Sequence, residues 1–156
     1  MWLTSITIPD SVTSIGSDAF AGCINLTNAT IGNSVTSIGS SAFYYCTNLK
    51  SITIPDSVTS IGNAAFSGCS SLTNATIGNS VTSIVSQAFS DCSGLTSITI
   101  PDSVTIIGSE AFFNCSSLST VNYFGTEEEW NAIDIDNTHE GNQDLLNANI
   151  NYNYKG

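Results

Sequence analysis

Hydrophobic residues recur along this chain at a fixed interval of 23 residues, without insertion or deletion. The recurring leucines are Leu3, Leu26, Leu49, Leu72, Leu95 and Leu118. Phenylalanine keeps the same interval at Phe20, Phe43, Phe66, Phe89 and Phe112, and cysteine keeps it at Cys23, Cys46, Cys69, Cys92 and Cys115. A repeat of this length is typical of a solenoid, in which each repeat forms one coil and buries its apolar side chains against its neighbours.

Each repeat opens with an alternating apolar and polar segment. Residues 6–8, Ile-Thr-Ile, have a period of two and predict a short strand. Stacked coils would pair these strands into one parallel sheet, with about 4.8 Å between coils. Pro9-Asp10 ends the first strand, because proline has no N–H for the ladder. Gly32-Asn33 replaces this pair in the second coil, and residues 12–15 predict a second extended stretch.

A short helix is predicted to close each coil. A serine or asparagine stands where such a helix needs an N-cap: Ser17, Ser40, Asn63, Ser86 and Ser109. Ala19, Phe20 and Cys23 would then share one face of the helix. The residues before the cysteines are Gly22, Tyr45, Gly68, Asp91 and Asn114. Four of these five tolerate the left-handed conformation that ends a helix, and Tyr45 is the exception.

A longer period is superimposed on the first. Coils one, three and five carry the sequence SITIPDSV, whereas coils two and four carry NATIGNSV. Two 23-residue coils therefore form a unit of 46 residues. We interpret this alternation as the duplication of a two-coil unit.

The repeat pattern ends after Leu118, which predicts five repeats over residues 1–117 and a capping segment over residues 118–156. Thr126 and Glu129 have the spacing of a capping box at the start of a helix. Trp130 and Ile133 would lie on the inner face of that helix, and residues 148–154 alternate as an edge strand. Such a segment would cover the apolar surface at the end of the stack.

The charge of the chain restricts its partners. Thirteen acidic residues face two lysines and no arginine, which gives a formal net charge of −11 over 156 residues. Nucleic acid and anionic membranes would be repelled, and no apolar stretch is long enough to insert into a bilayer. The first residues have no features of a secretory signal. We expect the chain to be a piece of a longer protein, whose uncapped N-terminal coil can self-associate.

The pattern Leu-x-x-Ile-x-Ile-Pro-x-x-Val-x-x-Ile-Gly-x-x-Ala-Phe-x-x-Cys-x-x-Leu, from Leu3 to Leu26, resembles the BspA-type leucine-rich repeat. The segment from GTEEEWNAIDI to LLNANINY is similar to the terminal cap of many such proteins. The resemblance implies an α/β repeat solenoid: a right-handed leucine-rich-repeat stack with a parallel sheet, short helices and a C-terminal cap. It also implies a secreted or cell-surface location, adhesion to host proteins such as fibronectin and fibrinogen, and contacts between bacteria.

Catalytic and metal chemistry have few candidate residues here. The cysteines are too widely spaced for a zinc motif, so we expect buried, reduced thiols that pack as small hydrophobic groups. His139, beside Asp136 and Glu140, is expected in a solvated loop. The acidic run 127–129 is expected to cap a helix. Asp10, Asp56 and Asp102 would lie about 10 Å apart, too far for one calcium shell. The sequence thus predicts no enzyme, no catalytic residue, no cofactor and no metal.

The outward side of the predicted sheet is the candidate binding surface. Its threonines are Thr7, Thr30, Thr53, Thr76 and Thr99, and they are flanked by Ser5, Asn28, Ser51, Asn74 and Ser97. We call these ten residues the ladder. It is either a protein- or glycan-binding concave face or only a set of residues that suit an exposed strand. The leading hypothesis is protein binding, to host or bacterial surface proteins or extracellular matrix. The alternative is a passive spacer.

Two further possibilities concern other residues and another ligand. Tyr44 and Tyr45 interrupt a series of small residues and could anchor a partner, although packing against adjacent coils is the simpler interpretation. The threonine ladder also has a weak analogy to ice-binding solenoids.

Overall fold

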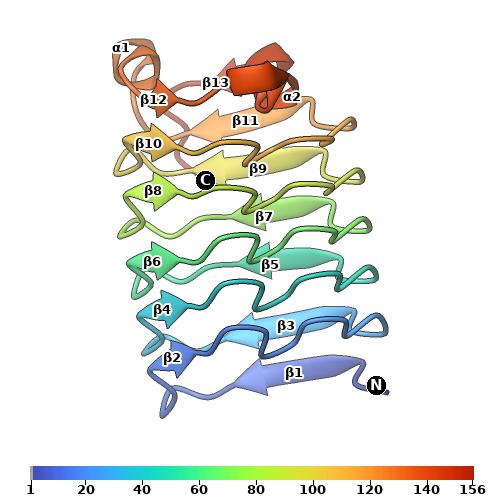
Figure 1. The fold of residues 1–156 in the computed structure, drawn as a ribbon. Coiled ribbons are helices and arrows are strands. Elements are labelled where there is room, and N and C mark those ends of the chain that lie inside the picture. Colours follow the sequence, from blue (N-terminus) through green and yellow to red (C-terminus); the bar gives the residue numbers. More distant parts are fainter. Residues whose placement is uncertain (1) are drawn as a thin grey trace.

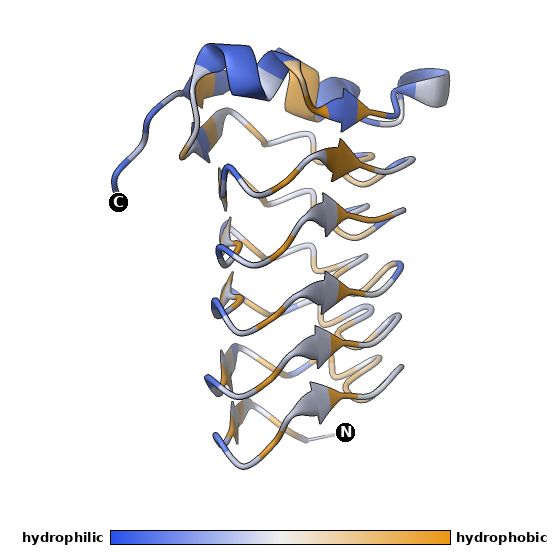
Figure 2. Cartoon of the chain, turned by 90° about the vertical axis from the view of Figure 1, so that its left-hand side faces the viewer, coloured by the Kyte–Doolittle hydropathy of each residue, from blue (hydrophilic) through white to orange (hydrophobic). Residues whose placement is uncertain are grey.

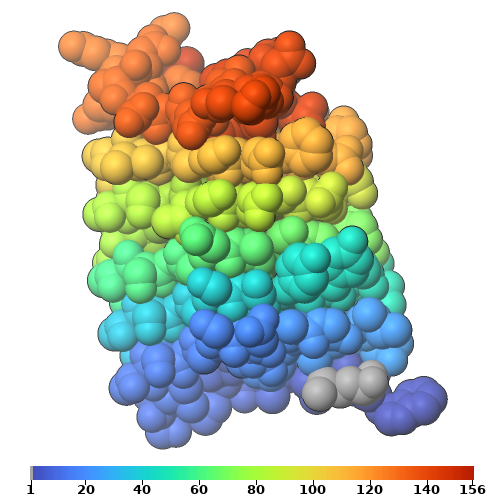
Figure 3. All heavy atoms as spheres, viewed as in Figure 1, coloured from blue at the N-terminus to red at the C-terminus, as the bar shows by residue number. Residues whose placement is uncertain are grey.

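Residues 2–156, which the computed structural model describes, form one stack of coils with a cap at its C-terminal end (Figure 1). Each coil follows the one before it along the axis of the stack, so that the coils appear as successive bands of colour in a space-filling view (Figure 3). The solenoid predicted from the 23-residue interval is therefore confirmed.

The first strands of the coils form one column, which we call the main sheet and which divides into two hydrogen-bonded sheets between the second and third coils. Its strands are β1 (Ser5–Ile8), β3 (Asn28–Ile31), β5 (Ser51–Thr53), β7 (Asn74–Thr76), β9 (Ser97–Ile100), β11 (Thr120–Tyr123) and β13 (Asn149–Asn151). All pairings are parallel, and the repeats pair one coil apart, so Thr7 faces Thr30 and Thr53 faces Thr76. β11 continues this register beyond the fifth coil. The boundary between residues 117 and 118 stays a prediction.

A second column of two-residue strands runs beside the main sheet. It consists of β2 (Ser14–Ile15), β4 (Ser37–Ile38), β6 (Ser60–Ile61), β8 (Ser83–Ile84), β10 (Ile106–Ile107) and β12 (Asp134–Ile135). The column divides into two sheets, β2-β4-β6 and β12-β10-β8, so no pairing joins β6 to β8.

The break in the second column occurs where Val85 replaces a recurring glycine. A Cβ atom added to Gly62 would overlap the backbone nitrogen of Ser40 in the preceding coil, and one added to Gly39 would overlap that of Ser17. The position thus requires close backbone approach between coils. Val85 brings a branched side chain to this contact, and the β6–β8 rung is open as a result.

The closing segment of each coil consists of turns, so the helix predicted there is wrong and the predicted N-cap residues cap no helix. Its successive N–H groups alternately donate to the next coil and to a residue of the same segment. Phe43 donates to the carbonyl of Ala65 in the next coil at 2.7 Å, whereas Tyr44 donates back to Ser41 at 3.0 Å. An α-helix also requires negative φ at every residue. Each segment instead has positive φ at Asp18, Ser41, Ala64, Gln87 or Glu110.

The interior contains the residues that the repeat predicted. Phe43, Phe66, Phe89 and Phe112 are fully buried, as are all five cysteines. The phenylalanine rings stack from coil to coil, with centroids 5.1–5.6 Å apart and interplanar angles of 20° or less. The residue before each cysteine has positive φ in all five coils, including Tyr45 at +55°.

The two-coil alternation has a structural basis at the turn after the main strand. The carboxylate of Asp10 accepts a hydrogen bond from the N–H of Asn33 in the next coil at 2.6 Å. Asp56 accepts one from Asn79 in the same way at 2.8 Å. A Cβ atom on Gly32 would lie 2.6 Å from the carbonyl oxygen of residue 8 and 2.8 Å from the carbonyl carbon of residue 9. A Pro-Asp turn therefore fits a Gly-Asn turn stacked on it, which explains the 46-residue unit.

The C-terminal segment covers the last coil with α1 (Glu127–Asn131), η1 (Thr138–Glu140) and α2 (Gln143–Asn147). Figure 2 shows that these helices are largely hydrophilic, whereas hydrophobic segments repeat from coil to coil beneath them. The capping box is confirmed: Glu129 N–H donates to Thr126 Oγ1, and Thr126 N–H donates to the Glu129 carboxylate. Trp130 and Ile133 are buried as predicted.

Asn142 supplies hydrogen bonds that the last turn segment would otherwise receive from a following coil. The N–H of Phe112 would reach an alanine carbonyl in a sixth turn segment, but here Asn142 Oδ1 accepts it at 3.0 Å. Its Nδ2 donates to the carbonyls of Gly108 at 2.9 Å and Asp136 at 2.6 Å. This fully buried side chain therefore supplies hydrogen bonds that a neighbouring backbone supplies elsewhere.

We predict that Gly62→Ala destabilises the protein by about 1–3 kcal/mol, because the new Cβ overlaps the adjacent coil. Gly16→Ala is the matched control, since nothing lies within 4 Å of a Cβ at that position. The control should be neutral or stabilising by up to about 1 kcal/mol. Urea unfolding followed by circular dichroism measures both. Equal effects of the two substitutions would contradict the proposed role of close coil contact.

We also predict that Asn142→Ala costs about 1–3 kcal/mol, because it leaves buried backbone groups without partners. Amide hydrogen exchange should accelerate at Phe112 in particular, since its N–H loses its acceptor. Asn147→Ala, at the exposed last residue of the helix that follows Asn142, should change the unfolding free energy by less than about 0.5 kcal/mol. Unchanged exchange at Phe112 would show that Asn142 does not hold the cap in place.

Candidate functional site

The ladder lies on the outward side of the main sheet, where neighbouring residues are in register. Thr7, Thr30 and Thr53 are exposed, whereas Thr76 and Thr99 are half-buried. The flanking residues Ser5, Asn28, Ser51 and Asn74 are exposed and Ser97 is half-buried. The sequence therefore placed these ten side chains on the correct side of the sheet.

Hydroxyl groups on this molecule fall into two kinds. Threonines in two other columns donate to the carbonyl of the preceding coil, as Thr73 does to Lys50 at 3.1 Å and Thr59 does to Thr36 at 3.2 Å. Further members of these columns are Thr27, Thr36, Thr96 and Thr105. Among residues 2–156, the hydroxyls of the five ladder threonines donate no such hydrogen bond. These hydroxyls are available to a ligand.

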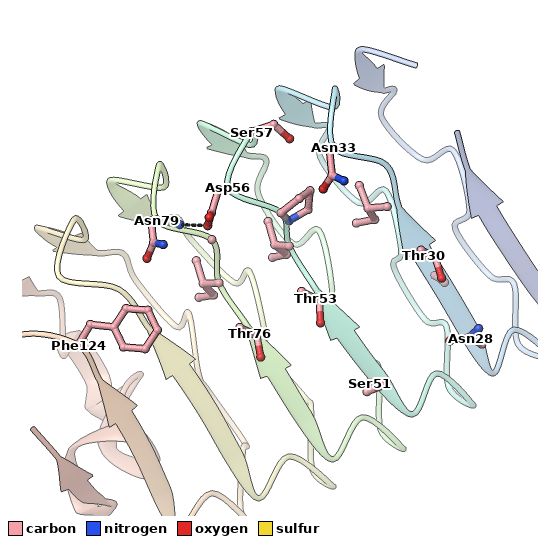
Figure 4. Close-up of a pocket in the computed structure, with 16 residues that line it drawn as sticks. Asn28, Thr30, Asn33, Ser51, Thr53, Asp56, Ser57, Thr76, Asn79 and Phe124 are labelled. Atoms are coloured by element: carbon pink, nitrogen blue, oxygen red, sulfur yellow. Dashed lines mark hydrogen bonds between the residues drawn. The ribbon is translucent and has the colours of Figure 1, made fainter. Parts of the chain in front are cut away.

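A groove of about 710 Å³ follows the ladder across coils two to four (Figure 4). The hydroxyls of Thr30, Thr53 and Thr76 line it, together with the side chain of Asn28. Three isoleucines at the ends of these strands or directly after them also contribute to its lining: Ile31, Ile54 and Ile77. The groove combines free polar groups with apolar surface, as a binding site requires.

One rim of the groove is formed by the turns that follow the strands. Asn33, Asp56 and Asn79 line it in consecutive coils, and Figure 4 shows the bond between Asp56 and Asn79. Because the Asn79 N–H occupies only Oδ1 of Asp56, the other carboxylate oxygen remains available. Ser57, next to Asp56, has a buried hydroxyl without a hydrogen-bond partner in residues 2–156.

An aromatic pair limits the groove toward the cap. Phe124 follows β11 and lines the groove, although it lies two coils beyond the other lining residues. The ring of Tyr154 stacks on it, with centroids 6.2 Å apart and an interplanar angle of 9°. Sequence reasoning missed this pair, because both residues come from the irregular terminal segment and only the fold brings them together.

The main sheet has an open rung within the groove. β3 and β5 belong to separate sheets, and Lys50 precedes β5 in the column that otherwise has a hydroxyl residue. The N–H of Lys50 reaches the carbonyl of Thr27 at 3.2 Å, whereas the corresponding Thr73 bond is 2.9 Å. Lysine also lacks the hydroxyl that Thr73 and Thr96 use to bind the preceding coil. At this rung the coils therefore have one side-chain hydrogen bond fewer than where a threonine precedes the strand.

Tyr44 and Tyr45 lie on the turn segment of coil two and are absent from the groove lining. Their rings are 4.7 Å apart, and each side chain is partly exposed. A Cβ atom on Gly68 would lie 2.7 Å from the Tyr45 ring, so this ring packs closely on the next coil. Packing between coils accounts for Tyr45.

The cysteine thiols are internal hydrogen-bond donors. Cys69 Sγ donates to the carbonyl of Phe43 at 3.3 Å, and Cys92 Sγ donates to that of Phe66 at 3.2 Å. All five cysteines are free and buried, as predicted. Burial raises the pKa of Cys46 to about 12, with a smaller contribution from neighbouring Cys23, and burial also raises the pKa of Cys115 to about 12. These thiols are neutral and unreactive near neutral pH.

His139 is exposed in η1, as the sequence predicted, with positive φ of 53°. Asp136 Oδ1 accepts a hydrogen bond from the N–H of Thr138 at 2.9 Å, and hydrogen bonds from Thr138 lower the pKa of Asp136. In residues 2–156, no three His, Cys, Asp or Glu side chains are grouped to hold a metal ion. No helix in this range is long and apolar enough to span a bilayer.

The first coil has an open face at the N-terminal end of the stack. Phe20 is only partly buried there, whereas the phenylalanines of later coils are fully buried. An apolar hollow of about 300 Å³ is lined by residues that include Ile6, Val12 and Phe20. Self-association through this face stays a prediction.

Comparison with known proteins agrees with this geometry. The family model described as BspA type leucine rich repeat region matches residues 2–125 in six copies. No curated protein matches the chain significantly in sequence.

Three solved structures illustrate the similarity. The leucine-rich repeat protein of T. pallidum is 32% identical to this chain, with a TM-score of 0.74, and the match covers 78% of this chain and 59% of the T. pallidum chain. A leucine-rich cell surface protein of Faecalibacterium prausnitzii is 30% identical with a TM-score of 0.55, covering 85% and 51%. The pneumococcal vaccine antigen PcpA is 27% identical with a TM-score of 0.66, covering 81% and 31%. The chain thus spans less than two thirds of each of these proteins.

We predict that the folded protein resists thiol reagents at pH 8, because burial keeps the thiols protonated and covered. Labelling should proceed only as the protein unfolds, and all five thiols should react in denaturant. Raised thiol pKa values also require stability to fall as pH rises above the unfolded value of about 8.5 toward the folded values. Fast labelling of the native protein would contradict this prediction.

Proposed function

This chain belongs to the BspA-type leucine-rich repeat family, and on that premise we propose that it is a non-enzymatic interaction module of a surface protein. Its partners are proteins of host or bacterial surfaces, including extracellular matrix, and they bind the ladder face. The names of two similar structures, a cell surface protein and a vaccine antigen, support a surface location.

One observation carries this proposal: the hydroxyls of Thr30, Thr53 and Thr76 are free and line a groove. The hydroxyls of Thr59 and Thr73 stabilise the stack, because they donate to the preceding coil. The ladder hydroxyls make no such bond, so stability of the stack does not explain them. Free hydroxyls in register form a regular row of donors and acceptors, and such a row suits an extended partner.

A passive spacer is the alternative function. The ladder has no arginine or tryptophan, and such residues dominate most protein interfaces. The affinity of one module should therefore be low and should depend on several modules binding at once. The spacer hypothesis predicts no partner at any copy number, so the two hypotheses differ in a measurable way.

The proposal predicts that Thr53→Glu with Thr76→Glu abolishes partner capture on arrays of host matrix and bacterial surface proteins. Glutamate is larger than threonine, so it fills the groove and removes the free hydroxyls that would meet the partner backbone. The two glutamates would face each other on paired strands, so the unfolding free energy should fall by about 1 kcal/mol or less.

Ser60→Glu with Ser83→Glu is the matched control, because it adds the same charges to the same two coils away from the groove, at one exposed and one half-buried position as in the groove variant. This control should keep capture intact. Equal loss in both variants would indicate a general charge effect, and capture that survives in the groove variant would eliminate the ladder face as the binding surface. Absence of any partner for the unsubstituted protein would favour the spacer.

A further inference from the structure

We propose that the groove binds an extended, basic segment of the partner protein in the polyproline II conformation, with lysine or arginine at every third residue. This inference rests on the proposed function and names the chemistry of its partner. Its grounds are the charge along the groove, the spacing of that charge and the aromatic pair at one end.

The charge is a column of aspartates at one turn position. Asp56 lines the groove, and Asp10 and Asp102 occupy the same position in coils one and five. Asp10 lies one coil before the lining residues, and Asp102 lies in the coil between Asn79 and Phe124. All three are exposed. The backbone N–H of Asn33 donates to one carboxylate oxygen of Asp10, and that of Asn79 donates to one carboxylate oxygen of Asp56. In each carboxylate the other oxygen remains for a partner.

The rest of the chain does little to neutralise this column. The net charge is −11, with two lysines in all: Lys50 precedes the lining residue Ser51, and Lys155 follows Tyr154, which stacks on Phe124. A cationic partner would therefore be attracted from a distance and would gain pairing at the rim. An acidic partner would be repelled, and a neutral glycan would gain hydrogen bonds but no charge pairing from the aspartates.

The spacing of the column selects a backbone conformation. The aspartates recur every second coil, about 9.6 Å apart at the strand spacing of parallel sheets. Three residues of polyproline II rise about 9.3 Å and complete one turn, so every third side chain points the same way. In a β-strand, residues three apart point to opposite faces. A polyproline II segment can therefore present a basic side chain to each aspartate in turn.

The remaining groove groups suit such a backbone. Polyproline II has no internal hydrogen bonds, so its carbonyl and N–H groups are free to meet the hydroxyls of Thr30, Thr53 and Thr76. Segments of this type also dock in grooves with aromatic walls. Phe124, supported by Tyr154, provides such a wall, and Pro55 adds an apolar contact in the same groove.

The test uses the full chain and a labelled synthetic peptide that repeats Lys-Pro-Ala, with binding measured by fluorescence anisotropy at low and physiological salt. Two peptides serve as controls: one repeats Glu-Pro-Ala, and one has the same composition as the first but with its lysines consecutive. We expect the Lys-Pro-Ala peptide to bind most tightly and its affinity to fall as salt rises.

The decisive variants change the aspartates to asparagine, which keeps the acceptor for the Asn33 and Asn79 N–H groups. Asp56→Asn should weaken binding about two- to fivefold, and substitution of all three aspartates should weaken it about tenfold. The matched control removes three charges from the cap by Glu127→Gln, Glu128→Gln and Asp134→Asn. It should leave affinity within about twofold of the unsubstituted protein.

Several results would overturn the inference. They are no binding of the Lys-Pro-Ala peptide, equal binding of the peptide with consecutive lysines, or equal losses in the groove and cap variants. Salt-independent capture of a neutral glycan in the groove would also overturn it. The proposed function would survive each of these results if Thr53→Glu with Thr76→Glu still abolished capture of a protein partner, so the two failures are distinguishable.

Discussion

The contact between one coil and the next is the constraint on which the structure depends. Half of the N–H groups in each turn segment bond within the segment, and the other half find an acceptor only in the following coil, as Phe43 does in Ala65. A single coil therefore cannot satisfy its backbone or bury its phenylalanine. The same contact determines the residue at each position: glycine where backbones approach, and cysteine where an inward thiol meets a carbonyl of the preceding coil.

Departures from the repeat have local effects because coils interact mainly with their neighbours. Val85 opens one rung of the second column, and Lys50 coincides with an open rung of the main sheet. The turn-side bonds continue through both places, for example from Phe66 to Ala88. The stack tolerates each irregularity, and both occur in the coils that border the groove.

Much of the fold follows from the sequence because period and burial are directly linked. Ile6-Thr7-Ile8 alternation gave the strand, the 23-residue interval gave the register, and Thr126 and Glu129 gave the cap helix. The turn segment was predicted wrongly because its conformation depends on bonds to another coil. The residues with positive φ, such as Ala64 and Gln87, show no common side-chain signal. Phe124 could not be assigned to the groove for a similar reason, since its neighbours there are distant in sequence.

Repetition also explains how a surface with few anchoring residues can select a ligand. Structural columns repeat at every coil, because every coil must bind its neighbour. The aspartates repeat at every second coil, because the Gly-Asn turns of coils two and four stack on the Pro-Asp turns of coils one and three. A stability requirement therefore sets the charge spacing at about 9.6 Å. A partner recognised through this spacing must have a matching period, and its affinity would then grow with the number of coils that it spans.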